Sequence, residues 1–219
     1  MLTLALDAST YAGSVAVLDG DRVIAECDVA MRGEHAERLM PAIATALETR
    51  DMRNLRRVVC GSGPGSFTSL RIAASLAKGI ARGRDIPLYA VPSLLLMVAG
   101  APETRAPGRY LAVLDAMRGD VFAACYEVAS SGDGILEVAS PALARRDSVA
   151  EIAASLRART IGPSEAIVAH PRARGVARLS AWLVTREHVD LTSWEPDYGR
   201  LAEAQVRWEA AHGRPLQVP

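Results

Sequence analysis

The sequence has few features of a metal site, a disulfide framework or a membrane-spanning segment. Its four histidines are scattered, with none at the spacing of helical metal ligands. The three cysteines, Cys27, Cys60 and Cys125, are odd in number and lie in apolar runs, which predicts buried, reduced thiols. No apolar run is long enough to span a bilayer, and no basic leader precedes the first one. We therefore expect a cytoplasmic protein with no metal and no cofactor.

The sequence also lacks an excess of either charge. It has 25 basic and 25 acidic residues, and Lys78 is the one lysine among them. Nucleic acids and anionic membranes are held mainly by concentrated positive charge, so neither is expected as a direct partner. The arginines of Arg172-Ala-Arg174 and of residues 53–57 are interpreted as solvated loop charges, and the alternative is a contribution to a composite RNA surface. Hydrophobic residues make up 50% of the chain, which excludes wholesale disorder.

Apolar periodicity predicts an α/β protein. In the first half it indicates strands over 2–7, 14–18, 23–29, 57–60 and 87–91, and helices over 35–50, 68–82 and 93–99. In the second half it indicates helices over 148–157 and 176–184. Residues 101–108, rich in proline and glycine, predict a boundary between lobes 1–104 and 105–219, and we expect the terminal helix to pack back on the first lobe.

The second half of the chain repeats the first. Leu4-Ala-Leu-Asp7-Ala8, a turn and a second apolar strand are echoed by Ala112-Val-Leu-Asp115-Ala116, another turn and another apolar strand. Two duplicated lobes with an aspartate at each hairpin are typical of the fold of actin, hexokinase and Hsp70, in which the aspartates face metal and phosphate. Aspartate at a strand end is also a common turn former, which is the alternative.

A glycine-rich loop over 61–68 lies between a predicted strand and a predicted helix, where backbone N–H groups can hold an anion. It is neither a Walker loop nor a dinucleotide fingerprint, because no lysine follows it and its glycines run G-x-G-x-G. The alternative is a tight turn in which Ser66 or Thr68 caps the next helix. The weak candidates for cofactor contact are Asp7, Gly63, Gly65 and Asp115.

The predicted helix over 68–82 carries small residues at regular spacing. Ala73, Ala77 and Ala81 lie at i, i+4 and i+8 and so share one face. Such a face permits another helix to approach closely, either from a partner chain or from the same chain. Spacing alone leaves both possibilities open. No G-x-S-x-G elbow or Cys–His arrangement indicates a catalytic nucleophile.

Five stretches of the sequence resemble the TsaB family, also called YeaZ. They are LALDAST (4–10), EHAERLMPAI (34–43), GSGPGSFTSLRI (61–72), DAMRGDVF (115–122) and PDYGR (196–200) followed by Glu203-Ala204. These stretches span nearly the whole chain in the expected order.

The resemblance implies an actin-like (ASKHA) fold with two duplicated lobes of mixed sheet flanked by helices. It also implies a non-catalytic subunit that pairs with a TsaD-type subunit to make threonylcarbamoyladenosine in tRNA next to the anticodon. A TsaE-type ATPase joins the larger complex, tRNA contact is indirect, and a homodimer forms when the partner is absent. Pairing uses the helices over 35–50 and 68–82, with candidate contacts at His35, Leu39, Ile43, Thr68, Leu70, Ala73, Ala77 and Ala81.

Two features of the sequence bear on catalysis. TsaD-type subunits carry a metal-binding histidine pair soon after the strand corresponding to 87–91, whereas this chain has no histidine between His35 and His170. Ser69 and Ala73 stand where the family usually has glycine, which adds bulk beside the loop. The alternative function is a nucleotide-binding ATPase or kinase-like enzyme of the actin-like superfamily. Glycoprotease activity has no supporting residues.

Overall fold

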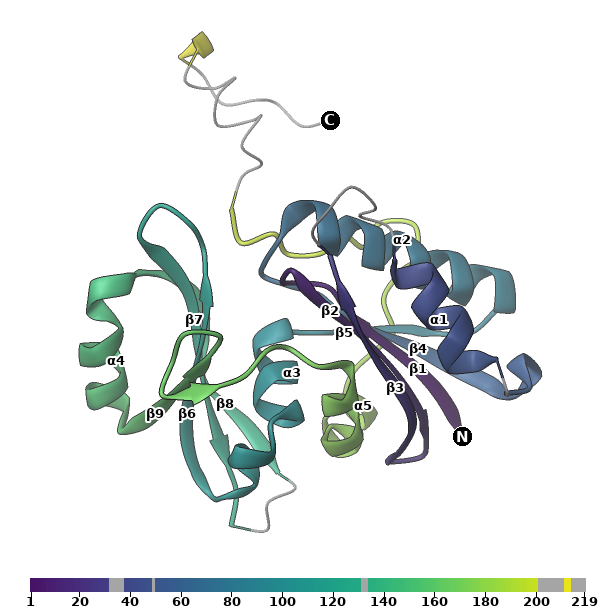
Figure 1. Cartoon of the computed structure of the whole chain (residues 1–219), viewed down its shortest axis with the longest axis horizontal. Helices are drawn as coiled ribbons and strands as arrows, with labels where there is room; N and C mark the ends of the chain where they lie inside the picture. Colours follow the sequence, from purple (N-terminus) through teal and green to yellow (C-terminus); the bar gives the residue numbers. More distant parts are fainter. Residues whose placement is uncertain (32–37, 49, 131–133, 201–210, 214–219) are drawn as a thin grey trace.

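The molecule is built around two five-stranded sheets with the same strand order (Figure 1). The computed structural model describes residues 1–31, 38–48, 50–130, 134–200 and 211–213. The sheet orders are β3-β2-β1-β4-β5 and β10-β9-β6-β7-β8, so β6 occupies in the second sheet the place of β1 in the first. The duplicated, actin-like arrangement predicted from the repeated aspartate hairpins is confirmed.

The first sheet is a three-stranded meander extended by two parallel strands. Its strands are β1 (Leu2–Asp7), β2 (Ala12–Asp19), β3 (Arg22–Ala30), β4 (Leu55–Gly61) and β5 (Leu88–Val91). β1 is antiparallel to β2 and parallel to β4, with Leu4 opposite both Val17 and Val58. Helices α1 (Leu39–Leu47) and α2 (Phe67–Arg84) cover one face, and a 3-10 turn, η1 (Met52–Asn54), leads into β4.

The second sheet repeats this plan with one helix on its outer face. Its strands are β6 (Gly108–Asp115), β7 (Asp120–Val128), β8 (Ile135–Arg145), β9 (Ala158–Gly162) and β10 (Ile167–Val168), and the helix is α4 (Val149–Leu156), preceded by η3 (Arg146–Ser148). The sequence pattern did not predict β8. This strand lies at the sheet edge, most of its side chains are exposed and it contains Pro141, so it lacks the apolar alternation of a buried strand.

Helix α3 (Ser93–Gly100) lies between the two sheets, and all eight of its residues are buried. A helix that is apolar on every side needs apolar neighbours on every side. Residues of both sheets supply them, among them Val59 and Leu18 from the first and Tyr110 and Leu114 from the second. The two sheets therefore share one hydrophobic core.

The segment predicted as one helix over 176–184 is instead two short pieces. They are the 3-10 helix η4 (Ala173–Arg178) and α5 (Ser180–Val184); a similar 3-10 turn, η2 (Pro102–Arg105), follows α3. A Cβ on Gly175 would lie 2.7 Å from the carbonyl oxygen of Leu96, so the path of η4 is set by close packing against α3. Tertiary contact overrides helix periodicity here.

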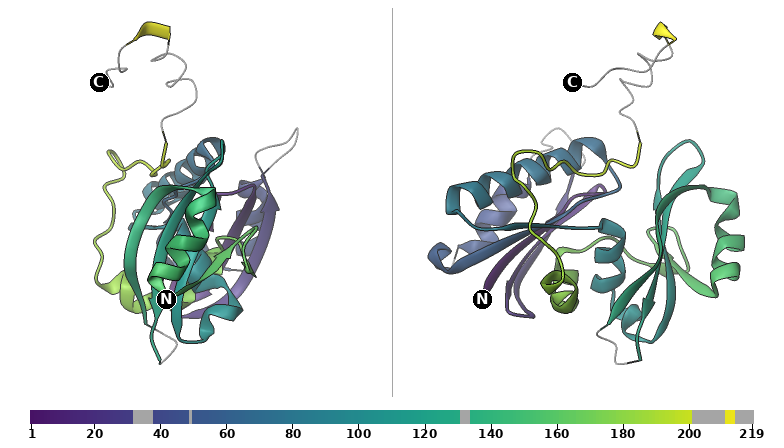
Figure 2. Two further views of the ribbon diagram at one scale, coloured as in Figure 1. Left: turned by 90° about the vertical axis from the view of Figure 1, so that its left-hand side faces the viewer. Right: turned by 180° about the vertical axis from the view of Figure 1, so that it is seen from behind.

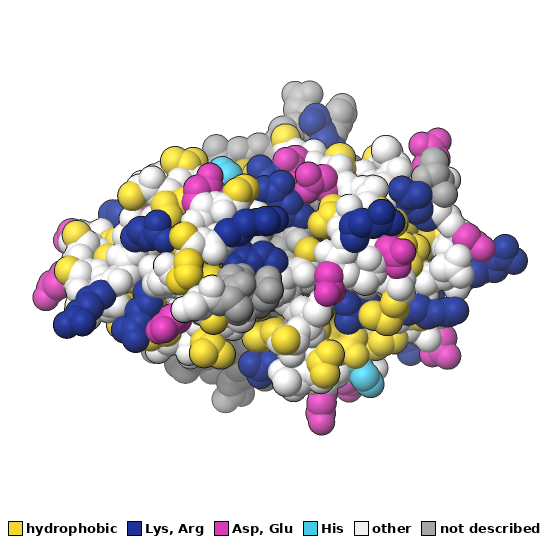
Figure 3. Space-filling model, turned by 90° about the horizontal axis from the view of Figure 1, so that it is seen from below, with side chains coloured by type: hydrophobic (Ala, Val, Ile, Leu, Met, Phe, Trp, Pro, Cys, Tyr) yellow, Lys and Arg dark blue, Asp and Glu magenta, His cyan; other side chains and the backbone are white. Residues whose placement is uncertain are grey.

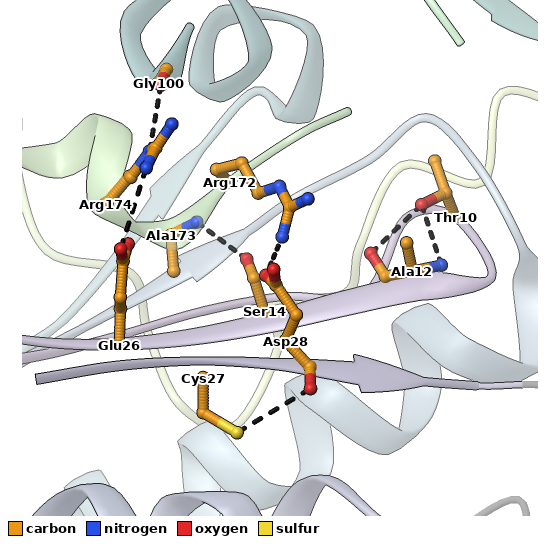
Figure 4. A network of polar contacts seen from close by, with 10 residues as sticks. All are labelled: Thr10, Ala12, Ser14, Glu26, Cys27, Asp28, Gly100, Arg172, Ala173 and Arg174. Carbon is orange, nitrogen blue, oxygen red and sulfur yellow. Dashed lines mark hydrogen bonds and ion pairs between the residues drawn. The ribbon is translucent and has the colours of Figure 1, made fainter. Parts of the chain in front are cut away.

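A polar network fixes the start of η4 on the first sheet (Figure 4). Arg172 forms an ion pair with Asp28, and Arg174 lies 3.6 Å from the carboxylate of Glu26. The backbone N–H of Ala173 donates to Ser14 Oγ at 2.7 Å. The interpretation of these arginines as solvated loop charges was wrong, because both are paired within the chain.

The three cysteines are free, as predicted, but they differ in burial. Cys60 and Cys125 are buried, and burial raises the pKa of both thiols. Cys27 is half-buried, since it lies on the edge strand β3, and its prediction as a buried thiol was wrong.

After α5 the chain returns to the first sheet as an irregular segment, residues 189–200, which we name the strap (Figure 2). The N–H of Val189 donates to Leu88 at the sheet edge, and the N–H of Asp197 donates to Ser62 in the glycine loop. The strap thus contacts the first sheet although it follows the second in sequence. The division into lobes 1–104 and 105–219 stays a prediction, and residues 201–210 of the expected terminal helix lie outside the described part of the chain.

Candidate functional site

The glycine loop packs against its own chain. A Cβ on Gly65 would overlap the carbonyl oxygen of Ser9, and a Cβ on Gly63 would overlap that of Asp197 in the strap. Gly63 also has a φ of +93°, which favours glycine. These contacts support a tight turn. The expected side-chain cap is absent, however, because the Ser66 hydroxyl donates to Ser69 Oγ at 3.0 Å instead of accepting from a helix N–H.

Asp7 at the end of β1 is completely buried. Its carboxylate accepts hydrogen bonds from the N–H and hydroxyl of Ser9 and from the hydroxyl of Ser93 at 2.6 Å. Desolvation raises its pKa above the ordinary value of 3.8 although these hydrogen bonds lower it. A Cβ on Gly61 would overlap this carboxylate, so Gly61 makes room for it. Asp7 therefore joins β1, the glycine loop and α3.

Burial of this carboxyl gives stability a characteristic pH dependence. Because the pKa of Asp7 is higher in the folded state than in the unfolded state, protonation of this carboxyl stabilises the folded protein. This contribution is fully present below pH 3.8 and is lost as the pH rises through the folded-state pKa. Asp7→Asn carries no such charge. We expect the free energy of unfolding of Asp7→Asn, minus that of the wild type, to increase in urea titrations as the pH rises above 3.8. A difference independent of pH would contradict a raised pKa.

The equivalent residue of the second half, Asp115, is exposed at the end of β6. Its carboxylate accepts from the N–H of Met117 at 3.1 Å, as a turn former does. Asp115 and Gly65 line a cleft of about 710 Å³ between the two sheets, whereas Asp7 and Gly63 do not. Of the four weak cofactor candidates, the structure thus places Asp115 and Gly65 at one cleft. Asp7 is buried and Asp115 is exposed, so the two aspartates of the repeat lie in different environments.

Side chains from both sheets and from the strap line this cleft. Its aromatic members are Tyr11, Phe67, Phe122 and Tyr198. Arg200 and His170 are the basic side chains among the lining residues, and Arg200 is paired with Asp120. Across the described residues, no three His, Cys, Asp or Glu side chains lie close enough to hold a metal ion.

The alanine stripe of α2 faces the first sheet. Ala73, Ala77 and Ala81 are fully buried in the core formed by this sheet, α1 and α2. Leu39, Ile43 and Leu70 are also buried, Thr68 is exposed, and His35 lies outside the described residues. A helix contact within the chain therefore accounts for the stripe. Ser69 is buried beside it and accepts the hydroxyl of Ser66.

The opposite face of α2 carries a second stripe of small residues. Ser75, Gly79 and Gly83 are exposed at i, i+4 and i+8, and a Cβ on either glycine would have no neighbour within 4 Å. Half-buried Ile72 and Leu76 flank this outer stripe, and with Phe67, Thr68, Arg71 and Ser75 they line a shallow groove of about 490 Å³. The sequence contained this stripe, but spacing did not reveal which of the two faced outward.

Neither charge sign dominates the face seen from below, where arginines and carboxylates alternate (Figure 3). This agrees with the zero net charge. No helix of the described residues is both long enough and apolar enough to cross a membrane.

A family model described as "TsaD: tRNA N6-adenosine threonylcarbamoyltransferase" matches residues 29–152. The Bacillus subtilis tRNA threonylcarbamoyladenosine biosynthesis protein TsaB is 32% identical to the chain over 232 residues, covering 95% of this chain and 98% of that protein. The chain belongs to the TsaB family. It is thus a homologue of proteins of threonylcarbamoyladenosine biosynthesis in tRNA. TsaB of Escherichia coli is 35% identical over 134 residues, 60% of this chain and 58% of that protein.

Solved structures of the TsaB family support this assignment. A Pseudomonas aeruginosa protein described as similar to peptidase YEAZ superposes with a TM-score of 0.77 at 26% identity, covering 91% of this chain and 99% of that chain. YeaZ from the same organism superposes with a TM-score of 0.75 at 25% identity, covering 90% and 99%. The resemblance stated from the five sequence stretches is confirmed.

Proposed function

We propose that the chain is the non-catalytic subunit that binds a TsaD-type subunit and supports it in making N6-threonylcarbamoyladenosine in tRNA next to the anticodon. The outer stripe of α2 is the observation that carries this proposal. Its two exposed glycines, one helical turn apart, leave the backbone open, and a small-residue helix face permits the close approach of another helix.

The surroundings of α2 limit which part of it a partner can reach. Its inner face is buried on the sheet, and the strap covers one flank, where Lys78 lies 3.6 Å from Glu195 and the Tyr198 ring lies 4.5 Å from that of Phe67. The outer stripe and its groove remain exposed. Apolar Ile72 and Leu76 beside small residues suit the centre of a protein interface.

The proposed lack of catalysis has independent support. Asp7, the candidate phosphate-facing residue of the first hairpin, is buried and bonded to Ser9 and Ser93. The close approaches of Gly63 and Gly65 are taken by the chain's own carbonyl groups. The sequence has no histidine between His35 and His170, where TsaD-type subunits carry their metal-binding pair. These features fit a subunit that acts through its surface.

Light scattering coupled to size-exclusion chromatography tests the proposal. We expect the chain mixed with the TsaD-type protein of the same genome to elute as a one-to-one complex, and the chain alone to pair with itself through the outer stripe. A TsaE-type ATPase is expected to join the complex, with tRNA contacting this chain only indirectly. Two unshifted peaks from folded proteins, or heat released on titration with ATP and magnesium, would favour the nucleotide-binding enzyme.

A further inference from the structure

The strap is held firmly on the first sheet. Val189 and Asp197 donate backbone hydrogen bonds of 2.9 Å and 2.8 Å to Leu88 and Ser62. The Tyr198 ring packs against that of Phe67 at the start of α2, with the two ring planes tilted by 46°. Both ends of this part of the strap are thus fixed to the first half of the molecule.

The last two residues of the strap reach the second sheet. A Cβ on Gly199 would overlap the ring of Phe122, so the strap backbone lies directly against β7. Arg200 forms an ion pair with Asp120, the first residue of β7. Asp120 follows a tight turn in which Met117, Arg118 and Gly119 have positive φ, and this turn belongs to the hairpin that forms one side of the cleft.

Three residues that make these contacts belong to the wall of the cleft. Phe122, Tyr198 and Arg200 all line it, together with the first hairpin from Ser9 to Ala12. Elsewhere the two sheets are joined through the buried helix α3. We propose that the strap is a latch that holds the second hairpin against the first half and keeps the cleft closed, with the Arg200–Asp120 pair as its releasable contact.

The latch has more contacts at its first-sheet end than at its second-sheet end, so release occurs at Arg200. The first-sheet end combines backbone hydrogen bonds with an aromatic contact, whereas the second-sheet end has one ion pair and one glycine contact. The Arg200 and Asp120 side chains are 26% and 21% exposed, so the pair is partly desolvated and weakly screened by salt.

Asp120 provides a matched control because it accepts a second arginine. Arg145 of β8 lies 3.1 Å from the same carboxylate but belongs to the second sheet, so it does not bridge the cleft. We expect Arg200→Gln to speed amide hydrogen exchange at least tenfold in the hairpin turns 9–12 and 116–119, with exchange in β1 and β6 unchanged. Arg145→Gln is expected to leave the hairpins at wild-type rates, and Arg200→Lys to restore slow exchange.

A second variant distinguishes loss of the latch from loss of folding. Gly199→Ala leaves both charges in place but adds a Cβ that would overlap Phe122 and lie 2.8 Å from Pro64. It therefore displaces the end of the strap and is expected to speed exchange in the same two hairpins. Thermal melting verifies that each variant is folded. Equal exchange in Arg200→Gln and Arg145→Gln, or faster exchange throughout β1 and β6 in both Arg200→Gln and Gly199→Ala, would overturn the latch.

Discussion

A Gly79→Arg variant is expected to lose at least about 100-fold in affinity for the TsaD-type subunit, about 2.7 kcal/mol, while melting at or slightly above the wild-type temperature. Gly79 is exposed and a Cβ there meets nothing, so the free protein has room for the longer side chain. In a complex, a partner helix packed on the outer stripe would have to bury an unpaired guanidinium, which is strongly unfavourable. Isothermal titration of each variant with the TsaD-type subunit measures the loss.

The control for this variant is another small residue on an exposed helix face far from α2. Ala154→Arg on α4 introduces the same side chain on the second sheet, and its affinity is expected to match the wild type. Ala77→Arg is unsuitable, because Ala77 is fully buried and the variant would fail to fold. Unchanged affinity in Gly79→Arg would remove the outer stripe from the interface.

Gly65→Ala is expected to destabilise the protein by about 3 kcal/mol or more. The added Cβ would overlap the carbonyl oxygen of Ser9, and this oxygen also accepts the N–H of Ser66 at 2.7 Å, so neither backbone segment can move freely. For a domain of about 200 residues this lowers Tm by about 10 °C. Thermal unfolding followed by circular dichroism measures the shift.

Gly79→Ala is the matched substitution without the clash. In an exposed helix interior the same added methyl group is expected to raise stability by about 0.5 to 1 kcal/mol. If Gly65→Ala melted with the wild type, the loop would not be packed on Ser9, and the glycines of 61–65 would again be candidates for ligand contact.

The sequence predicted the elements that have a strong apolar period. The repeat around Asp7 and Asp115 predicted two lobes, and both sheets have the same strand order. The helices predicted over 68–82 and 93–99 correspond to α2 and α3. In these segments local pattern and tertiary burial agree, because one face or every face of the element meets the core.

The predictions at the candidate site were limited because two faces of α2 have the same residue spacing and because several contacts are long-range. In α2 the stripes beginning at Ala73 and Ser75 have the same i, i+4, i+8 spacing, so periodicity could not distinguish the inner face from the outer one. The strap has no regular period, and its partners Leu88 and Ser62 are 101 and 135 residues earlier in the chain than Val189 and Asp197. Which residue approaches a given glycine depends on the tertiary fold, so the local sequence does not predict it.

The position of α3 makes the two halves of the molecule depend on each other for folding. A half-chain ending at residue 104 would contain this helix and the first sheet, yet the side of α3 that meets Tyr110 and Leu114 would be open to water. The other half would leave the corresponding face of its own sheet uncovered. Although the chain is duplicated, each copy completes the hydrophobic core of the other, and the pair constitutes one cooperative folding unit.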